Sequence, residues 1–77
     1  MFRLLMSRGD VVRIMLNGRE REVGDRTLLS DLLTTLGIPP DGWAAEVNGR
    51  LVPRSEVGRV FLCAGDRVEV VTLVGGG

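Results

Sequence analysis

The apolar residues of this chain fall into short runs that are separated by turn-forming dipeptides. The first run, residues 11–16, is followed by Asn17-Gly18 and by a charged stretch over residues 19–23. Asn-Gly between two strand-like runs predicts a two-residue hairpin, because both positions tolerate a positive φ. Basic and acidic residues alternate along the second strand, so we expect it at an edge of the sheet or with one face in solvent.

Leucines recur at helical spacing in the next segment. The apolar side would hold Leu28, Leu29, Leu32, Leu33 and Leu36, and the opposite side Ser30, Asp31, Thr34 and Thr35. This spacing predicts one amphipathic helix of about ten residues, and the helix dipole favours Asp31 in its first turn. Thr27 is the expected N-cap, and Gly37 is the expected left-handed residue that ends the helix before Pro39-Pro40.

Two further strands are predicted after the helix. Residues 43–47 form a short apolar run, Asn48-Gly49 forms a second turn, and residues 50–52 form the return strand. Residues 53–56 should break the ladder, because they begin with a proline that donates no backbone hydrogen bond. Residues 57–64 should be irregular or form a single helical turn.

Gly65-Asp66 introduces the last predicted strand, residues 67–74, which is rich in valine. The element order is therefore β-β-α-β-(β)-β. One main helix would pack across one face of a mixed four- to five-stranded sheet, with the first and last strands adjacent in its middle. This α+β arrangement is the β-grasp, or ubiquitin-like, fold. An all-β barrel fits less well because the leucine-rich helix is so clear.

Residues 11–74 account for a single β-grasp domain, because 77 residues are too few for two hydrophobic cores. Residues 1–10 add nothing to the pattern. We interpret them as a flexible leader, or as residues that lie upstream of the functional start of the protein. Residues 75–77 form a separate glycine tail.

The composition excludes several functional classes. Ten arginines balance ten acidic residues, so we expect no attraction to nucleic acid or to an anionic membrane. Histidine is absent and Cys63 is the single cysteine, which excludes a disulfide framework and a cysteine–histidine zinc site. No segment approaches the roughly 20 apolar residues of a membrane span. The lack of a disulfide fits a reducing, cytoplasmic setting.

Gly75, Gly76 and Gly77 directly follow the last predicted strand. They have no side chains to pack and a high entropic cost of ordering, so we expect the tail to stay mobile. Such a tail can enter a narrow channel on another protein and present the Gly77 carboxylate there. Taken alone, the tail is also compatible with a frayed end or a cloning remnant.

Alternation along the last strand predicts two different faces. Val68 and Val70 should point toward the helix, whereas Val71 and Leu73 should point to the face that has no helix. With Leu51, these two side chains are candidates for a partner-docking patch. The alternative is that neighbouring strands half-bury them.

Four other residues are candidates for a role. Arg50 and Arg54 are expected to be solvated or to contact acidic groups of a partner. Trp43 is interpreted as a packing residue of the core or its rim rather than as a stacking platform. Cys63 is interpreted as buried filler rather than as a sulfur acceptor, because no basic partner lies next to it in the sequence.

With these elements in place, the chain resembles the ThiS family, the small sulfur carriers of thiamine biosynthesis. The matching segments are residues 16–19, 27–33, 46–55 and 64–71 together with the terminal glycines. The combination of Val-Pro-Arg-Ser, a late Gly-Asp-x-Val-Glu-Val strand and a terminal Gly-Gly is quite specific. Residues 1–10 fall outside the family pattern.

The resemblance implies a sulfur-transfer cycle at Gly77. A ThiF-like activating enzyme would adenylate the carboxylate with ATP, and sulfur from a persulfide would displace AMP to leave a thiocarboxylate. A ThiG-like thiazole synthase would take this sulfur for the thiazole ring. The chain itself would bind no cofactor and perform no catalysis. The tail, Gly75 to Gly77, would enter the partner's active site, while docking would use Val71, Leu73, Leu51 and Arg54.

Four alternatives remain open at this point. The small subunit of molybdopterin synthase shares the fold and the tail, although Val-Pro-Arg-Ser and the valine-rich last strand favour the thiamine carrier. The second alternative is a carrier for another sulfur route, such as cysteine formation or tRNA thiolation. The third is a protein-conjugating ubiquitin-like modifier. The fourth, a β-grasp binding module, would not need a terminal Gly-Gly.

Overall fold

The computed structural model of this chain describes residues 10–73. In chain order the elements are β1 (Val11–Leu16), β2 (Arg19–Gly24), α1 (Leu29–Thr35), β3 (Trp43–Val47), β4 (Arg50–Val52), the 3-10 helix η2 (Arg54–Arg59) and β5 (Arg67–Thr72). All five predicted strands are confirmed, and β5 ends at Thr72. Residues 1–9 and 74–77 lie outside the described residues, so the expectations for the leader (residues 1–10) and for the glycine tail (residues 75–77) stay predictions.

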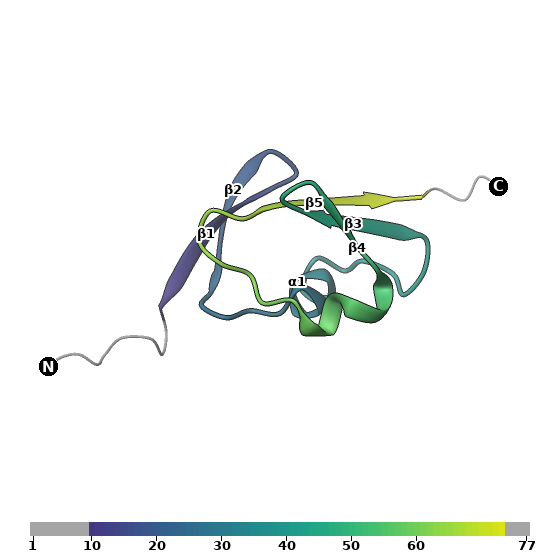
Figure 1. Cartoon of the computed structure of the whole chain (residues 1–77), viewed down its shortest axis with the longest axis horizontal. Helices are drawn as coiled ribbons and strands as arrows, with labels where there is room; N and C mark the ends of the chain where they lie inside the picture. The colour runs from purple at the N-terminus through teal and green to yellow at the C-terminus, as the bar shows by residue number, and fades with distance from the viewer. Residues whose placement is uncertain (1–9, 74–77) are drawn as a thin grey trace, which may run out of the picture.

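The five strands form one mixed sheet in the order β2-β1-β5-β3-β4. β1 and β5 run parallel in its middle, while the β1–β2, β3–β4 and β3–β5 pairs are antiparallel. β2 lies at an edge, as its charge alternation predicts. Both helices lie on one side of the sheet (Figure 1). This is the predicted β-grasp arrangement, and neither helix covers the opposite side, which we call the outer face.

Both Asn-Gly dipeptides form the predicted hairpin turns. φ is 50° at Asn17 and 82° at Gly18, and it is 54° at Asn48 and 83° at Gly49. Two successive positive φ values belong to the type I′ turn, whose twist matches the twist of the paired strands. The turns therefore fix the registers Leu16↔Arg19 and Val47↔Arg50 next to them.

The helix begins differently from the prediction. α1 covers seven residues, and its N-cap is Leu28, which makes no side-chain capping bond. The predicted cap, Thr27, is wrong, because its hydroxyl instead donates to the carbonyl of Gly24 at 2.6 Å. Backbone pairing between Leu28 and Phe61 holds the entry to the helix in place. A contact with a segment more than 30 residues away thus replaces the local cap.

The helix ends as predicted. Gly37 has a φ of 73°, its N–H donates to the carbonyl of Thr34, and the Ile38 N–H donates to the carbonyl of Leu33. These two bonds make up the Schellman motif, which needs a left-handed residue at the Gly37 position. The second helical segment, η2, begins earlier than the predicted turn in residues 57–64, because Pro53 accepts a bond from the Glu56 N–H at 2.8 Å.

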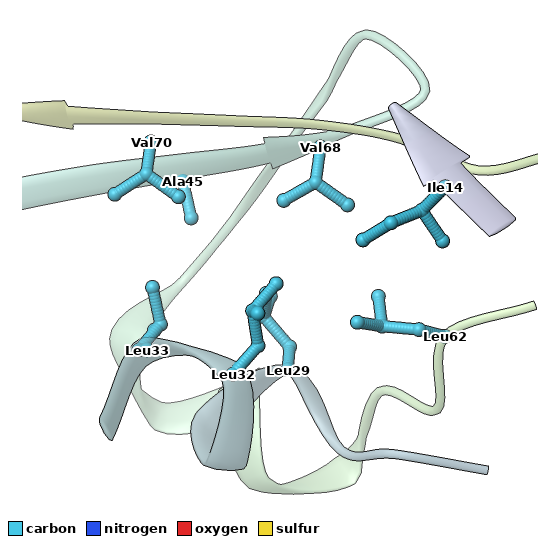
Figure 2. Packing of buried hydrophobic residues seen from close by; sticks show 8 residues of the cluster. All are labelled: Ile14, Leu29, Leu32, Leu33, Ala45, Leu62, Val68 and Val70. Atoms are coloured by element: carbon cyan, nitrogen blue, oxygen red, sulfur yellow. The ribbon is translucent and has the colours of Figure 1, made fainter. Parts of the chain in front are cut away.

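One hydrophobic core joins the sheet to the helical layer (Figure 2). Its buried members are Ile14, Ala45, Val68 and Val70 from the sheet, Leu29, Leu32 and Leu33 from α1, and Leu62 from the segment before β5. The sheet residues and the helix residues point toward one another across the layer. The leucine spacing and the inward placement of Val68 and Val70 are therefore confirmed.

The two faces of β5 make a matched stability test. Val68→Ala should lower the free energy of unfolding by roughly 2 kcal/mol, because Val68 is fully buried and its loss leaves a cavity. Val71→Ala, the same change on the exposed face of the same strand, should stay within about 0.5 kcal/mol of the parent. Urea unfolding followed by the fluorescence of Trp43 measures both values. Equal losses in the two variants would contradict the assignment of faces.

Candidate functional site

The candidate site is the end of β5 together with the outer face around it. β5 lies at the centre of the sheet. Leu73 follows it, and Val74 and the three glycines come next in the sequence. β3 pairs with β5 from Val47↔Val68 to Trp43↔Thr72. Beyond this ladder, the Leu73 N–H donates to the carbonyl of Gly42. The chain is therefore held on the β3 side up to Leu73.

The pairing on the β1 side of β5 is shorter and ends in a side-chain contact. β1 pairs with β5 only through Met15↔Arg67 and Leu16↔Val68. The amide of Asn17 then extends the ladder: its Oδ1 accepts from the Val70 N–H at 2.8 Å, and its Nδ2 donates to the Val70 carbonyl at 3.3 Å. This turn residue therefore fixes β5 two residues beyond the backbone pairing.

Asn48 holds the beginning of β5 in a similar way from the other hairpin. Its Oδ1 accepts from the Arg67 N–H at 2.9 Å, and its Nδ2 donates to Asp66 Oδ1 at 3.0 Å. Neither amide contact was predicted from the sequence, where the two asparagines were interpreted only through their tolerance of positive φ. The sequence did hold a signal for these contacts. Both turns begin with asparagine, whose side-chain amide can form hydrogen bonds, rather than with glycine, which has none.

The outer face carries the predicted docking residues. Val71, Leu73 and Leu51 are 55%, 59% and 66% exposed. Ala44 pairs with Val71, and it lines one hollow together with Leu51. Ala44, Leu51, Val71 and Leu73 are called the apolar patch below. These side chains are accessible to a partner, and docking stays a prediction.

Arg54 lies at the margin of the apolar patch. Its guanidinium contacts Asp41 Oδ1 at 2.6 Å and lies 5.8 Å from the centroid of the Trp43 ring. Trp43 is half-buried against the core, and its indole Nε1–H donates to the Pro40 carbonyl at 3.3 Å. The interpretation of Trp43 as a rim packing residue is therefore confirmed. Arg50 is exposed at the start of β4.

Cys63 is exposed, so its interpretation as buried filler is wrong. Its N–H donates to Asp66 Oδ2 at 2.8 Å, and its carbonyl accepts from the Asp66 N–H at 3.1 Å. This tight turn directs the preceding side chain, Leu62, into the core with 1% exposure. The Cys63 side chain is left on the solvent side of the turn.

The part of the chain that the structure describes offers no metal site and no buried charge. Among residues 10–73, no three His, Cys, Asp or Glu side chains are placed to hold a metal ion, and no polar or charged residue is buried. No helix in this region is long and apolar enough to cross a membrane. The predicted site of covalent chemistry, Gly77, lies outside the described residues, as do Gly75 and Gly76.

The amide contact of Asn17 with β5 can be tested on its own. Asn17→Gly keeps the positive φ without strain, so its effect reports the lost amide. We expect a loss of roughly 1–2 kcal/mol in unfolding free energy and faster hydrogen exchange at the Val70 N–H. Asn48→Gly is the matched control and should expose the Arg67 N–H instead. Unchanged protection of Val70 in Asn17→Gly would contradict the proposed contact.

Comparisons with known proteins agree with this architecture. The crystal structure of the thiamine biosynthesis protein ThiS from Geobacter metallireducens has a TM-score of 0.73 and 25% identity; the match covers 86% of this chain and 100% of that one. The solution structure of a thiamine biosynthesis protein from the same organism gives the same score and identity, covering 86% of this chain and 88% of that one.

Two curated relatives are longer proteins. A thiazole synthase of Paramagnetospirillum magneticum is 33% identical over 66 residues, and one of Magnetococcus marinus is 39% identical over 66 residues. Each match covers 86% of this chain and 20% of the relative, so the chain spans about a fifth of the length of these relatives. The family model of ThiS matches residues 14–77, which include β2 to β5 and the terminal glycines. The chain therefore belongs to the ThiS family.

Proposed function

We propose that this chain is the sulfur carrier for thiazole formation in thiamine biosynthesis, with the Gly77 carboxylate as the group that is modified. The observation that carries this proposal is the match to the ThiS family over a central strand that leads directly into three glycines. The family and the names of the curated relatives point to thiamine rather than to a pterin as the recipient pathway.

The proposed chemistry needs an activated carboxylate. The Gly77 carboxylate attacks the α-phosphate of ATP on a ThiF-like activating enzyme, which gives an acyl adenylate and releases pyrophosphate. The outer sulfur of a persulfide then attacks the carbonyl carbon and AMP leaves. A thiol cleaves the resulting S–S bond and frees the thiocarboxylate. Glycine suits this sequence because its carbonyl carries no side chain that would hinder the attack.

Thiazole synthase is the proposed recipient of the sulfur. Two proteins that bear this name contain a region similar to this chain within one much longer polypeptide. A carrier-like region and the synthase function thus occur together in those relatives, which supports a physical association between the two here. In this proposal the chain is a co-substrate, its partners supply all catalytic groups, and the cycle takes place in the cytoplasm, where ATP and thiols are available.

The apolar patch is the proposed docking surface for these partners. Exposed apolar side chains at the end of a central strand have no packing role inside the domain, whereas they can exclude water from an interface. Arg54 at the margin of the patch would contact a polar rim. A partner that grips the tail also needs a rigid anchor beside it, because the position of the reacting carboxylate must be reproducible.

The site of modification is tested by intact mass. After incubation with the activating enzyme, ATP and a persulfide donor, the protein should gain about 16 Da, the difference between sulfur and oxygen. Deleting Gly77 withdraws the carboxylate by about 3.5 Å and should abolish the gain. Cys63→Ser should leave it unchanged. A gain that depends on Cys63 and not on Gly77 would show that the sulfur is carried elsewhere.

The docking role of the patch is tested by Leu73→Glu. Its affinity for the activating enzyme and for thiazole synthase should fall about thirtyfold, or roughly 2 kcal/mol, if Leu73 is central to the interface. Its melting temperature should stay close to that of the parent, because the side chain is 59% exposed. Val11→Glu is the control: Val11 is 55% exposed at the start of β1. A strongly destabilised Leu73→Glu, or one that binds like the parent, would defeat the claim.

A further inference from the structure

Two glutamates lie directly opposite each other on the outer face. Glu46 of β3 and Glu69 of β5 are register partners in the antiparallel pair, and both are exposed. Like charges directly opposite on neighbouring strands destabilise a sheet. Two central strands therefore carry a repulsive pair in the free protein, at a position where a neutral or oppositely charged residue would be more stable.

The described residues supply no ion-pair partner for either carboxylate. The ion pairs in residues 10–73 are Arg13 with Glu22 at 3.7 Å and Arg54 with Asp41 at 2.6 Å. Arg67 lies two residues from Glu69 on the same side of β5, yet it forms no pair with Glu46 or Glu69 within 4.0 Å. Locally, two carboxylates face one guanidinium.

The pair lies in a shallow depression that the two hairpin turns leave open. This depression, called the acidic hollow below, is lined by Met15, Gly18, Glu46, Gly49, Arg67 and Glu69. A Cβ built at Gly18 or at Gly49 would meet nothing within 4 Å, so the hollow is accessible over both turns. A long side chain of a partner can therefore reach the carboxylates from the solvent.

The acidic hollow is continuous with the apolar patch. Leu51 pairs with Glu46 across the β3–β4 ladder, and Val71 follows Glu69 on the same face of β5. A partner that covers the patch therefore also removes water from the two carboxylates. Covering two carboxylates that have only one guanidinium near them costs free energy, which a cation from the partner would offset.

We propose that thiazole synthase docks on the outer face with a basic side chain placed between Glu46 and Glu69, an inference that rests on the proposed function. Apolar side chains next to it would cover Leu51 and Val71. Arginine fits best, because its planar guanidinium can bond two carboxylates at once and is more weakly hydrated than an ammonium group. The acidic hollow would then orient the carrier, while the apolar patch supplies most of the contact area.

The experiment compares Glu46→Gln, Glu69→Gln and the double variant with the parent for binding to the cognate thiazole synthase. The double variant should bind about tenfold more weakly, and its affinity should depend less on salt between about 50 and 300 mM NaCl. Its melting temperature should equal or exceed that of the parent, because the repulsion is gone. Glu56→Gln in η2, on the opposite side of the sheet, matches each single variant in residue type and net charge and should bind like the parent.

Each other outcome has a definite meaning. Parent-like affinity and salt dependence in the double variant would overturn the proposal, and so would an equal loss in Glu56→Gln or a loss accompanied by a lower melting temperature. The gain of about 16 Da at Gly77, measured on the same samples, separates this failure from that of the proposed function. A parent that gains the mass while the double variant binds normally defeats only the role of the glutamates. A parent that neither gains the mass nor binds the synthase defeats both.

Discussion

The structure depends on the placement of β5 between two hairpins. The strand has no hairpin of its own, and its parallel contact with β1 spans only two register pairs. Its position comes from the antiparallel ladder to β3 and from the amides of Asn17 and Asn48, which bond its backbone at Val70 and Arg67. The same two turns that set the hairpin registers therefore also set the register of the strand that leads to the glycines.

Alternation along β5 links stability to function. The inward residues, Val68 and Val70, supply two of the eight buried core positions, and the outward residues form the acidic hollow and the apolar patch. A shift of one residue in register would exchange these sets, placing Glu69 in the core and Val68 in solvent. Because burying an unpaired carboxylate is so costly, the core that stabilises the domain also fixes which side chains lie on the outer face.

The sequence predicts those features that depend on near neighbours. Each Asn-Gly turn, the leucine spacing of α1 and the alternation of β5 follow from residues within a few positions of one another. Several features that it missed depend on contacts between distant segments. Leu28 at the start of α1 is held by pairing with Phe61, and Asn17 bonds Val70 across 53 positions. The opposition of Glu46 and Glu69 likewise emerges only once the β3–β5 register is known. Cys63 was missed for a local reason, because Asp66, three residues on, closes the turn around it.

The last contact along the strand limits how far Gly77 can lie from the apolar patch. Gly42 has a φ of 79°, which favours glycine, and its carbonyl accepts the Leu73 N–H. The loop before β3 thereby meets the chain at the edge of the apolar patch. From Leu73 only four residues remain, which span at most roughly 14 Å. Any enzyme that modifies Gly77 must therefore hold its reactive centre within that distance of the patch. In the proposed function, the docking surface and the reactive centre of one partner would therefore lie next to each other.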